Sequence, residues 1–166
     1  MTTTYKVFIT PKEVSEVATE AFVVGLHVTN GNLRYDLAAA IKNRHNRKTC
    51  IVMAYVDGKP VGIILGYINT RQINTYVRPT HRKRGIGQCL VKTFREATGL
   101  QKSLLIGEPG YTGWESFFKR NYIYVISYNF RLSEHPGKTI RQILTAVNKR
   151  PKQLMRKALI DSYMQL

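Results

Sequence analysis

The chain has 166 residues, and its 26 Lys and Arg against 10 Asp and Glu give a formal net charge of +16 at pH 7. That length predicts one domain with a buried core, and a composition of 43% hydrophobic and 22% charged residues excludes a disordered chain. No apolar run approaches the ~20 residues that span a bilayer, and Cys50 and Cys89 lack the spacing of a zinc site or disulfide framework. We therefore expect a soluble, cytoplasmic protein without a metal, whose charge favours polyanionic or phosphorylated partners; a bacterial or viral origin is compatible with this expectation.

Hydrophobic periodicity and turn residues predict a series of strands and helices along the chain. Strands are expected at residues 5–9, 50–56, 60–69, 72–77, 103–107 and 122–130. Helices are expected at residues 12–26, 33–46, 86–98 and 113–121. Asp57-Gly58 lies between two apolar runs and predicts a hairpin, and Gly99 is the expected C-cap of the third helix. This order predicts an α/β (α+β) fold with a mixed, partly antiparallel central sheet flanked by helices.

The chain changes character near residue 135, which divides it into a domain at residues 1–134 and a basic extension at residues 135–166. Two helices are expected in the extension, at residues 138–148 and 152–164. Its cations include Arg141, Lys149, Arg150, Lys152, Arg156 and Lys157. Such a surface predicts binding to nucleic acid or to an acidic protein; a solvated face without a partner, a membrane-surface contact and an oligomer contact are the alternatives.

The most informative segment is the loop between the strand at residues 72–77 and the helix at residues 86–98. Gly85 and Gly87 lie at the helix start, where free N–H groups and the helix dipole favour an anion. Arg82, Lys83 and Arg84 add positive charge beside them. The loop has neither G-x-x-x-x-G-K-[ST] nor G-x-G-x-x-G, so it is not the usual nucleoside triphosphate or dinucleotide loop.

Residues 82–87, Arg-Lys-Arg-Gly-Ile-Gly, match the R/Q-x-x-G-x-G/A signature of the GNAT acetyltransferase superfamily. Val77-Arg78-Pro79 resembles the V-x-P that closes the fourth strand of that family, and residues 117–123 resemble its F-Y-x-x-x-G-F segment. The resemblance extends from about residue 5 to residue 130. It implies the GNAT fold, with acetyl-CoA or another acyl-CoA as the co-substrate.

The resemblance also implies which residues bind the co-substrate. The pyrophosphate would lie on Arg82, Lys83, Arg84, Gly85, Ile86, Gly87 and Gln88, mainly through backbone N–H groups. The pantetheine arm and acyl carbonyl would lie on the main chain of Thr75, Tyr76 and Val77. The family transfers the acyl group directly to an amine, so Cys89 is not needed as a nucleophile and is expected to be a buried helix residue.

The sequence departs from the family at the groups that move protons. Phe118 stands where the family often has a tyrosine that protonates the leaving thiolate, and phenylalanine has no proton to give. Tyr111 is the replacement we select, with Tyr122 as the other option. Glu108 is the best candidate for the base, ahead of Glu115, and His81 beside the phosphate loop is expected to bind rather than to catalyse.

These residues predict an N-acetyltransferase that acts on an amine of a protein, an RNA-associated molecule or a small molecule, with the net charge favouring an acidic or nucleic-acid-associated acceptor. A GNAT fold without turnover, acting as a binding or structural part of a viral particle or nucleoprotein assembly, is the alternative. A basic nucleic-acid binder unrelated to CoA leaves the glycine loop unexplained.

Overall fold

The computed structural model describes residues 2–28, 30–42, 48–103, 105–107, 114–121 and 123–125. The strands are β1 (Thr3–Phe8), β2 (Thr49–Val56), β3 (Lys59–Tyr67), β4 (Gln72–Val77), β5 (Leu105–Gly107) and β6 (Ile123–Val125). The helices are α1 (Pro11–Val23), α2 (Gly31–Ile41), the short 3₁₀ helix η1 (Pro79–His81), α3 (Ile86–Thr98) and α4 (Trp114–Arg120). The predicted order of elements is confirmed over these ranges, while the extension at residues 135–166 lies outside them.

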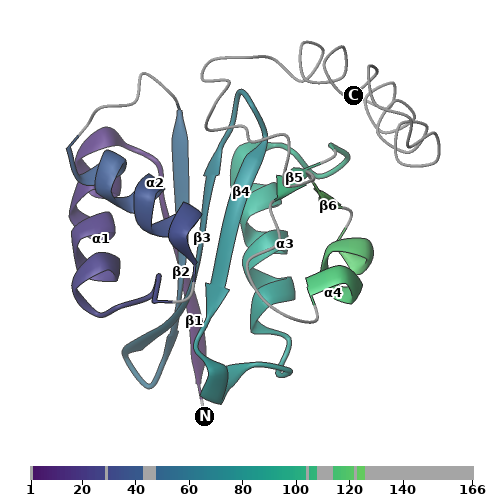
Figure 1. Ribbon diagram of the computed structural model, residues 1–166, viewed down its shortest axis with the longest axis horizontal. Helices are drawn as coiled ribbons and strands as arrows, with labels where there is room; N and C mark the ends of the chain where they lie inside the picture. The colour runs from purple at the N-terminus through teal and green to yellow at the C-terminus, as the bar shows by residue number, and fades with distance from the viewer. Residues whose placement is uncertain are drawn as a thin grey trace.

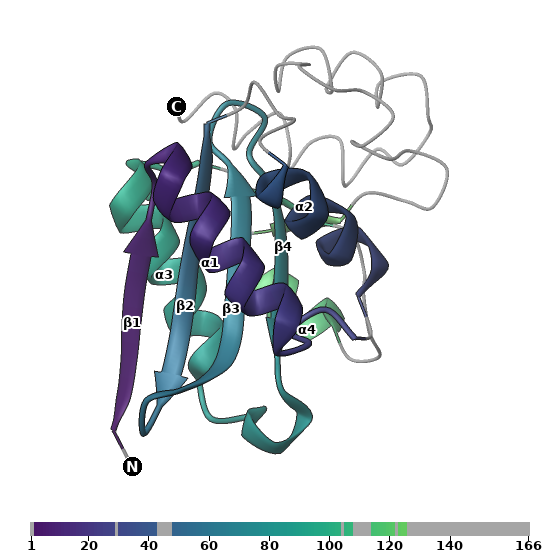
Figure 2. The same cartoon turned by 90° about the vertical axis from the view of Figure 1, so that its left-hand side faces the viewer.

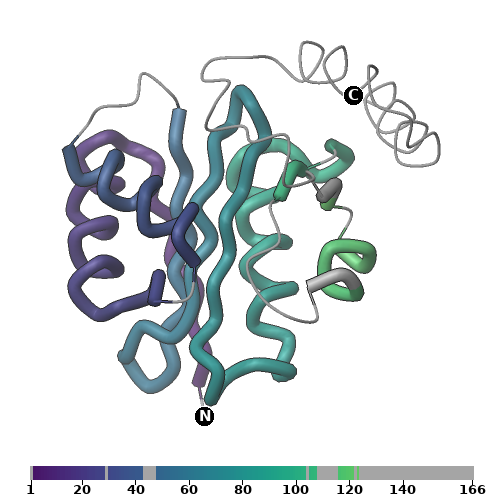
Figure 3. Tube along the Cα trace, in the orientation of Figure 1, coloured from purple at the N-terminus to yellow at the C-terminus, as the bar shows by residue number. Residues whose placement is uncertain are grey.

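The six strands form one mixed sheet whose spatial order follows the sequence, from β1 to β6 (Figures 1 and 3). Strands β1 to β4 pair antiparallel, and β5 and β6 continue the sheet in parallel. The hairpin between β2 and β3 turns at Asp57 and Gly58, whose φ angles are 50° and 78°. Two consecutive positive φ angles are typical of a type I′ turn, which explains why Asp-Gly predicted this hairpin correctly.

Helices cover both faces of the sheet (Figures 1 and 2). Helices α1 and α2 lie on one face, and α3 and α4 lie on the other. Successive residues of β2 supply two separate cores: Ile51 and Met53 face α1 and α2, while Val52 and Ala54 face α3. Because both faces are covered, β2 is apolar along nearly its whole length instead of alternating with polar residues.

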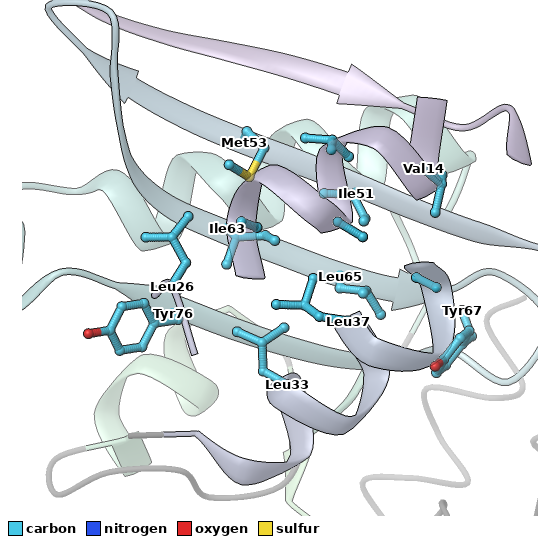
Figure 4. Close-up of a cluster of buried hydrophobic side chains, with 14 of the residues drawn as sticks. Val14, Leu26, Leu33, Leu37, Ile51, Met53, Ile63, Leu65, Tyr67 and Tyr76 are labelled. Carbon is cyan, nitrogen blue, oxygen red and sulfur yellow. The ribbon is translucent and has the colours of Figure 1, made fainter. Parts of the chain in front are cut away.

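Figure 4 shows the core between the sheet and the pair α1 and α2. Leu33 and Leu37 of α2 lie in the same cluster as Ile63 and Leu65 of β3. The Asn30 side chain caps α2 by accepting a hydrogen bond from the N–H of Leu33 at 3.0 Å. This cap starts α2 at Gly31, two residues earlier than the sequence pattern predicts. No helix in the described ranges is long and apolar enough to cross a membrane.

Candidate acyl-CoA site

Strands β4 and β5 pair over a short stretch only. Their last pair joins Ile73 to Gly107, whereas β3 remains paired with β4 as far as Val77. In the part of the chain that the structure describes, residues 75–77 therefore have one edge paired with β3 and the other edge open. An open strand edge presents main-chain donors and acceptors that an extended ligand can pair with.

The main-chain direction of β4 follows from one bond at its end. The N–H of Arg78, the residue after β4, donates to the carbonyl of Val61 at 2.8 Å, so this N–H faces β3. Successive residues of a strand point their main-chain groups to opposite edges, and residues two apart point them to the same edge. The N–H and carbonyl groups of Thr75 and Val77 consequently face the open edge of β4.

Both of these outward carbonyls are already hydrogen-bonded to side chains. The Asn30 Nδ2 donates to the Thr75 carbonyl at 3.4 Å, and the Arg82 Nε donates to the Val77 carbonyl at 2.8 Å. Arg82 also holds its guanidinium 5.6 Å from the centre of the Tyr76 ring. Each bond offsets part of the negative charge of a carbonyl, although a carbonyl oxygen can accept a second bond. The N–H groups of Thr75 and Val77 are the main-chain donors at this edge.

The first turn of α3 supplies a second group of donors. Gly85 is the N-cap residue, with a φ of 78° that favours glycine, and no side chain caps the helix. The first helical bond runs from the Cys89 N–H to the Gly85 carbonyl at 3.0 Å. The N–H groups of residues 86–88 therefore have no partner within the helix, and the helix dipole adds partial positive charge at this point. The arrangement suits a phosphate or pyrophosphate.

A cavity of about 500 Å³ joins the open edge of β4 to this helix start. Its lining residues are Thr75, Tyr76, Val77, His81, Arg82, Lys83, Gly85, Ile86, Gly87, Gln88, Phe117, Arg120 and Asn121. Three of them carry a positive charge and none is acidic. The cavity therefore combines the open strand edge, the N–H groups at the start of α3 and a cationic wall in one continuous space.

The structure places the ten predicted co-substrate residues as follows. Nine of them line the cavity, and Arg84 is exposed and does not. Three further lining residues were not assigned to the site from the sequence: Phe117 and Arg120 of α4, and Asn121 directly after it. The signal for them was indirect, because they lie in the segment that resembles the family's F-Y-x-x-x-G-F motif.

The predicted proton-transfer residues lie mostly outside the described ranges. Glu108, Tyr111 and Tyr122 are not part of them, and the side chain of Glu115 is not described either. His81 lines the cavity. Phe118 is buried, with 6% of its side chain exposed, in the core between the sheet and α3. No group of three or more His, Cys, Asp and Glu residues in the described ranges could hold a metal ion.

The expectation that Cys89 is buried is wrong. Cys89 is exposed on the first turn of α3, beside Tyr5 of β1. Burial, together with a hydrogen bond to Cys89 and the charge of its thiolate, raises the pKa of Tyr5 to about 12. The sequence pattern predicted the wrong environment for Cys89 because the next residue, Leu90, faces the core. The Cys89 side chain instead points toward the edge strand β1.

Comparisons with known proteins agree with this geometry. Residues 47–121 match the model of the acetyltransferase (GNAT) domain. The fold is similar to that of a ribosomal-protein-alanine N-acetyltransferase from Brucella melitensis biovar Abortus 2308, with 14% identity and a TM-score of 0.50 over 79% of this chain and 96% of that one. It is also similar to an aminoglycoside acetyltransferase from an uncultured soil metagenomic sample, solved with trehalose, at 10% identity and a TM-score of 0.51 over 78% and 93% of the two chains. No curated protein sequence matches the chain.

Proposed function

The chain carries a GNAT acetyltransferase domain, and from this premise we propose that it transfers the acetyl group of acetyl-CoA directly to an amine. The observation that carries the proposal is one continuous cavity that connects the open edge of β4 with the uncapped start of α3. Acetyl-CoA combines an extended amide-containing arm with a pyrophosphate. For the arm, the cavity offers the main-chain donors of β4. For the pyrophosphate, it offers the N–H groups at the start of α3 with cations beside them.

In this proposal each part of the site has a separate task. The N–H groups of residues 86–88, with Arg82 and Lys83, bind the pyrophosphate. The N–H groups of Thr75 and Val77 pair with the arm and polarise the thioester carbonyl, where negative charge develops as the amine attacks. Glu108 as the proton acceptor and Tyr111 as the donor to the thiolate remain predictions from the sequence.

The acceptor that we propose is an amine on an acidic or nucleic-acid-associated molecule. Its support is the net charge of +16, which attracts anionic partners and repels cationic ones such as polyamines. The basic residues Arg141 to Lys157 of the extension would add to this attraction. If the proposal is correct, acetylation of acidic peptides with a free N-terminus exceeds acetylation of spermidine, and the difference shrinks as salt is raised.

Calorimetric titration of acetyl-CoA tests the co-substrate site. The variant Gln88→Glu places a negative charge in the first turn of α3. This charge interacts favourably with the helix dipole, so the helix is not destabilised, but it repels a pyrophosphate. Gln101→Glu is the matched control, because Gln101 is exposed beyond the other end of α3. We expect micromolar binding, about −8 kcal/mol, weakened at least about tenfold by Gln88→Glu and unchanged by Gln101→Glu. Absence of binding by the unaltered protein would overturn the proposal.

One observation favours a second candidate, a GNAT domain that binds acyl-CoA without turnover. Phe118 is buried in the core and has no hydroxyl group that could protonate a thiolate. Binding of acetyl-CoA without acetylation of any acidic peptide, nucleic-acid-associated amine or polyamine would support this candidate. Acetylation that disappears in Tyr111→Phe or Glu108→Gln, with acetyl-CoA binding retained, would exclude it.

A further inference from the structure

Asn30 does not line the proposed acyl-CoA cavity and comes from another layer of the fold. The helices that line the cavity are α3 and α4, whereas Asn30 precedes α2, which lies against β4 from the other face (Figure 2). Its side chain nevertheless reaches the open edge of β4, because Nδ2 donates to the Thr75 carbonyl. Asn30 is therefore a side chain from the α1 and α2 face that contacts the main chain of a cavity-lining residue.

The bond changes what the strand edge presents to a ligand. A bare carbonyl at Thr75 would place partial negative charge beside the Thr75 N–H, which faces the same edge. The thioester carbonyl becomes an oxyanion during transfer. The Thr75 carbonyl would repel this oxyanion, and the Thr75 N–H would stabilise it. By donating to the Thr75 carbonyl, Asn30 offsets the unfavourable group and leaves the favourable one available, as Arg82 does at Val77.

The position of Asn30 is fixed by its own surroundings. The residue is 7% exposed, and its Oδ1 accepts the N–H of Leu33 at 3.0 Å. One amide group therefore uses its oxygen to start α2 and its nitrogen to reach β4. Because the oxygen is held by the helix, the nitrogen is directed toward the strand without freedom to flip.

We propose that Asn30 is a positioning residue: by donating to the Thr75 carbonyl it offsets the partial negative charge on the β4 edge and so favours an acyl carbonyl at the Thr75 N–H. This inference rests on the proposed function, since it requires an acyl-CoA on that edge. It assigns a role in acyl transfer to a residue that does not line the cavity, and it links the face of α2 to the reacting bond.

The test is the carbonyl stretching frequency of acetyl-CoA labelled with ¹³C at the thioester carbonyl and bound to the protein. In Asn30→Ser the serine hydroxyl still caps α2, since Ser and Asn are comparable N-caps, but it is too short to reach β4. We expect the unaltered protein to lower the frequency relative to free acetyl-CoA, and Asn30→Ser to lose at least half of that shift. Affinity for CoA without an acetyl group should change less than about twofold, because the pyrophosphate site on α3 is intact.

Thr10→Ala serves as the stability control. It removes the side-chain cap of α1 and so lowers the stability of the protein by an amount typical of a lost N-cap. Because Thr10 does not contact β4, the frequency shift should be unchanged. An equal shift in Asn30→Ser and the unaltered protein, or no shift in the unaltered protein, would overturn the role of Asn30 while acetyl-CoA binding stands. Failure of the unaltered protein to bind acetyl-CoA would instead overturn the proposed function.

Discussion

The ring of Phe117 occupies the space beside Gly87: a β-carbon added at Gly87 would lie 2.9 Å from the Phe117 Cε2 atom. Helix α4 thus packs against the first turn of α3 through a position that only glycine leaves open. Both residues line the proposed acyl-CoA cavity. Gly87, the second glycine of the R-x-x-G-x-G signature, therefore has two effects. It makes room for the Phe117 ring in the cavity wall, and it lets a ligand approach the backbone closely.

Gly87→Ala should displace Phe117 and with it the α4 wall of the cavity. Overpacking of this kind costs about 1–3 kcal/mol, so we expect a lower melting temperature together with weaker acetyl-CoA binding. The double variant Gly87→Ala with Phe117→Ala restores the space and should recover part of the binding. If Gly87→Ala alone melts and binds like the unaltered protein, α4 does not depend on this contact.

Gly66 serves a similar purpose in the core. A β-carbon at Gly66 would collide with the ring of Phe94, which is fully buried between α3 and the sheet. Gly66→Ala should therefore destabilise the domain by about 1–3 kcal/mol. Gly31→Ala is the matched control: nothing lies within 4 Å of its added β-carbon, so it should be neutral or stabilise by up to about 1 kcal/mol. Equal urea midpoints for the two variants would contradict this packing.

A buried polar cluster joins α2 to the sheet. The Tyr67 hydroxyl donates to Asp36 Oδ1 at 2.8 Å, and the Asn74 Nδ2 donates to Asp36 Oδ2 at 2.6 Å. Asp36→Asn would turn an NH₂ group toward one of these donors and should cost about 1–3 kcal/mol. Asp57→Asn makes the same chemical change at an exposed position with a positive φ, which asparagine tolerates. Calorimetric melting should show a loss for Asp36→Asn and none for Asp57→Asn.

Local signals in the sequence predicted the parts of this fold that depend on near neighbours. Asp57-Gly58 specified the β2–β3 hairpin, and Gly99 ends α3 with a φ of 75° as expected of a C-cap. The glycine loop was read correctly as the link between a strand and a helix. These features depend on the conformations open to one or two residues, which amino-acid type reveals directly.

Features that depend on contacts distant in sequence were missed. The lining role of Arg120 and Asn121 requires α4 to lie beside the α3 start, and the contact from Asn30 to Thr75 spans 45 residues. The exposure of Cys89 likewise depends on where β1 lies relative to α3. No local pattern of residue types encodes such distances, because periodicity gives the face of an element but not what that face meets.

The Tyr55 hydroxyl donates to Glu20 Oε1 at 3.3 Å under α1. Burial first, and then the charge and hydrogen bond of Glu20, raise the pKa of Tyr55 from its ordinary value near 10 to about 12. Above pH 10 the unfolded chain releases a proton that the folded protein retains. The stabilisation is therefore complete below pH 10 and is lost as the pH rises toward 12.

Tyr55→Phe keeps the ring under the Lys6 ammonium, 5.0 Å from its centroid, and removes the ionising group. Tyr5 and Cys50 also have pKa values raised to about 12, so both proteins should still lose stability in alkali. The loss between pH 9 and pH 11, measured by urea unfolding, should be smaller for Tyr55→Phe. Parallel stability curves for the two proteins would show that Tyr55 titrates alike in the folded and unfolded chains, which its burial beside a carboxylate does not allow.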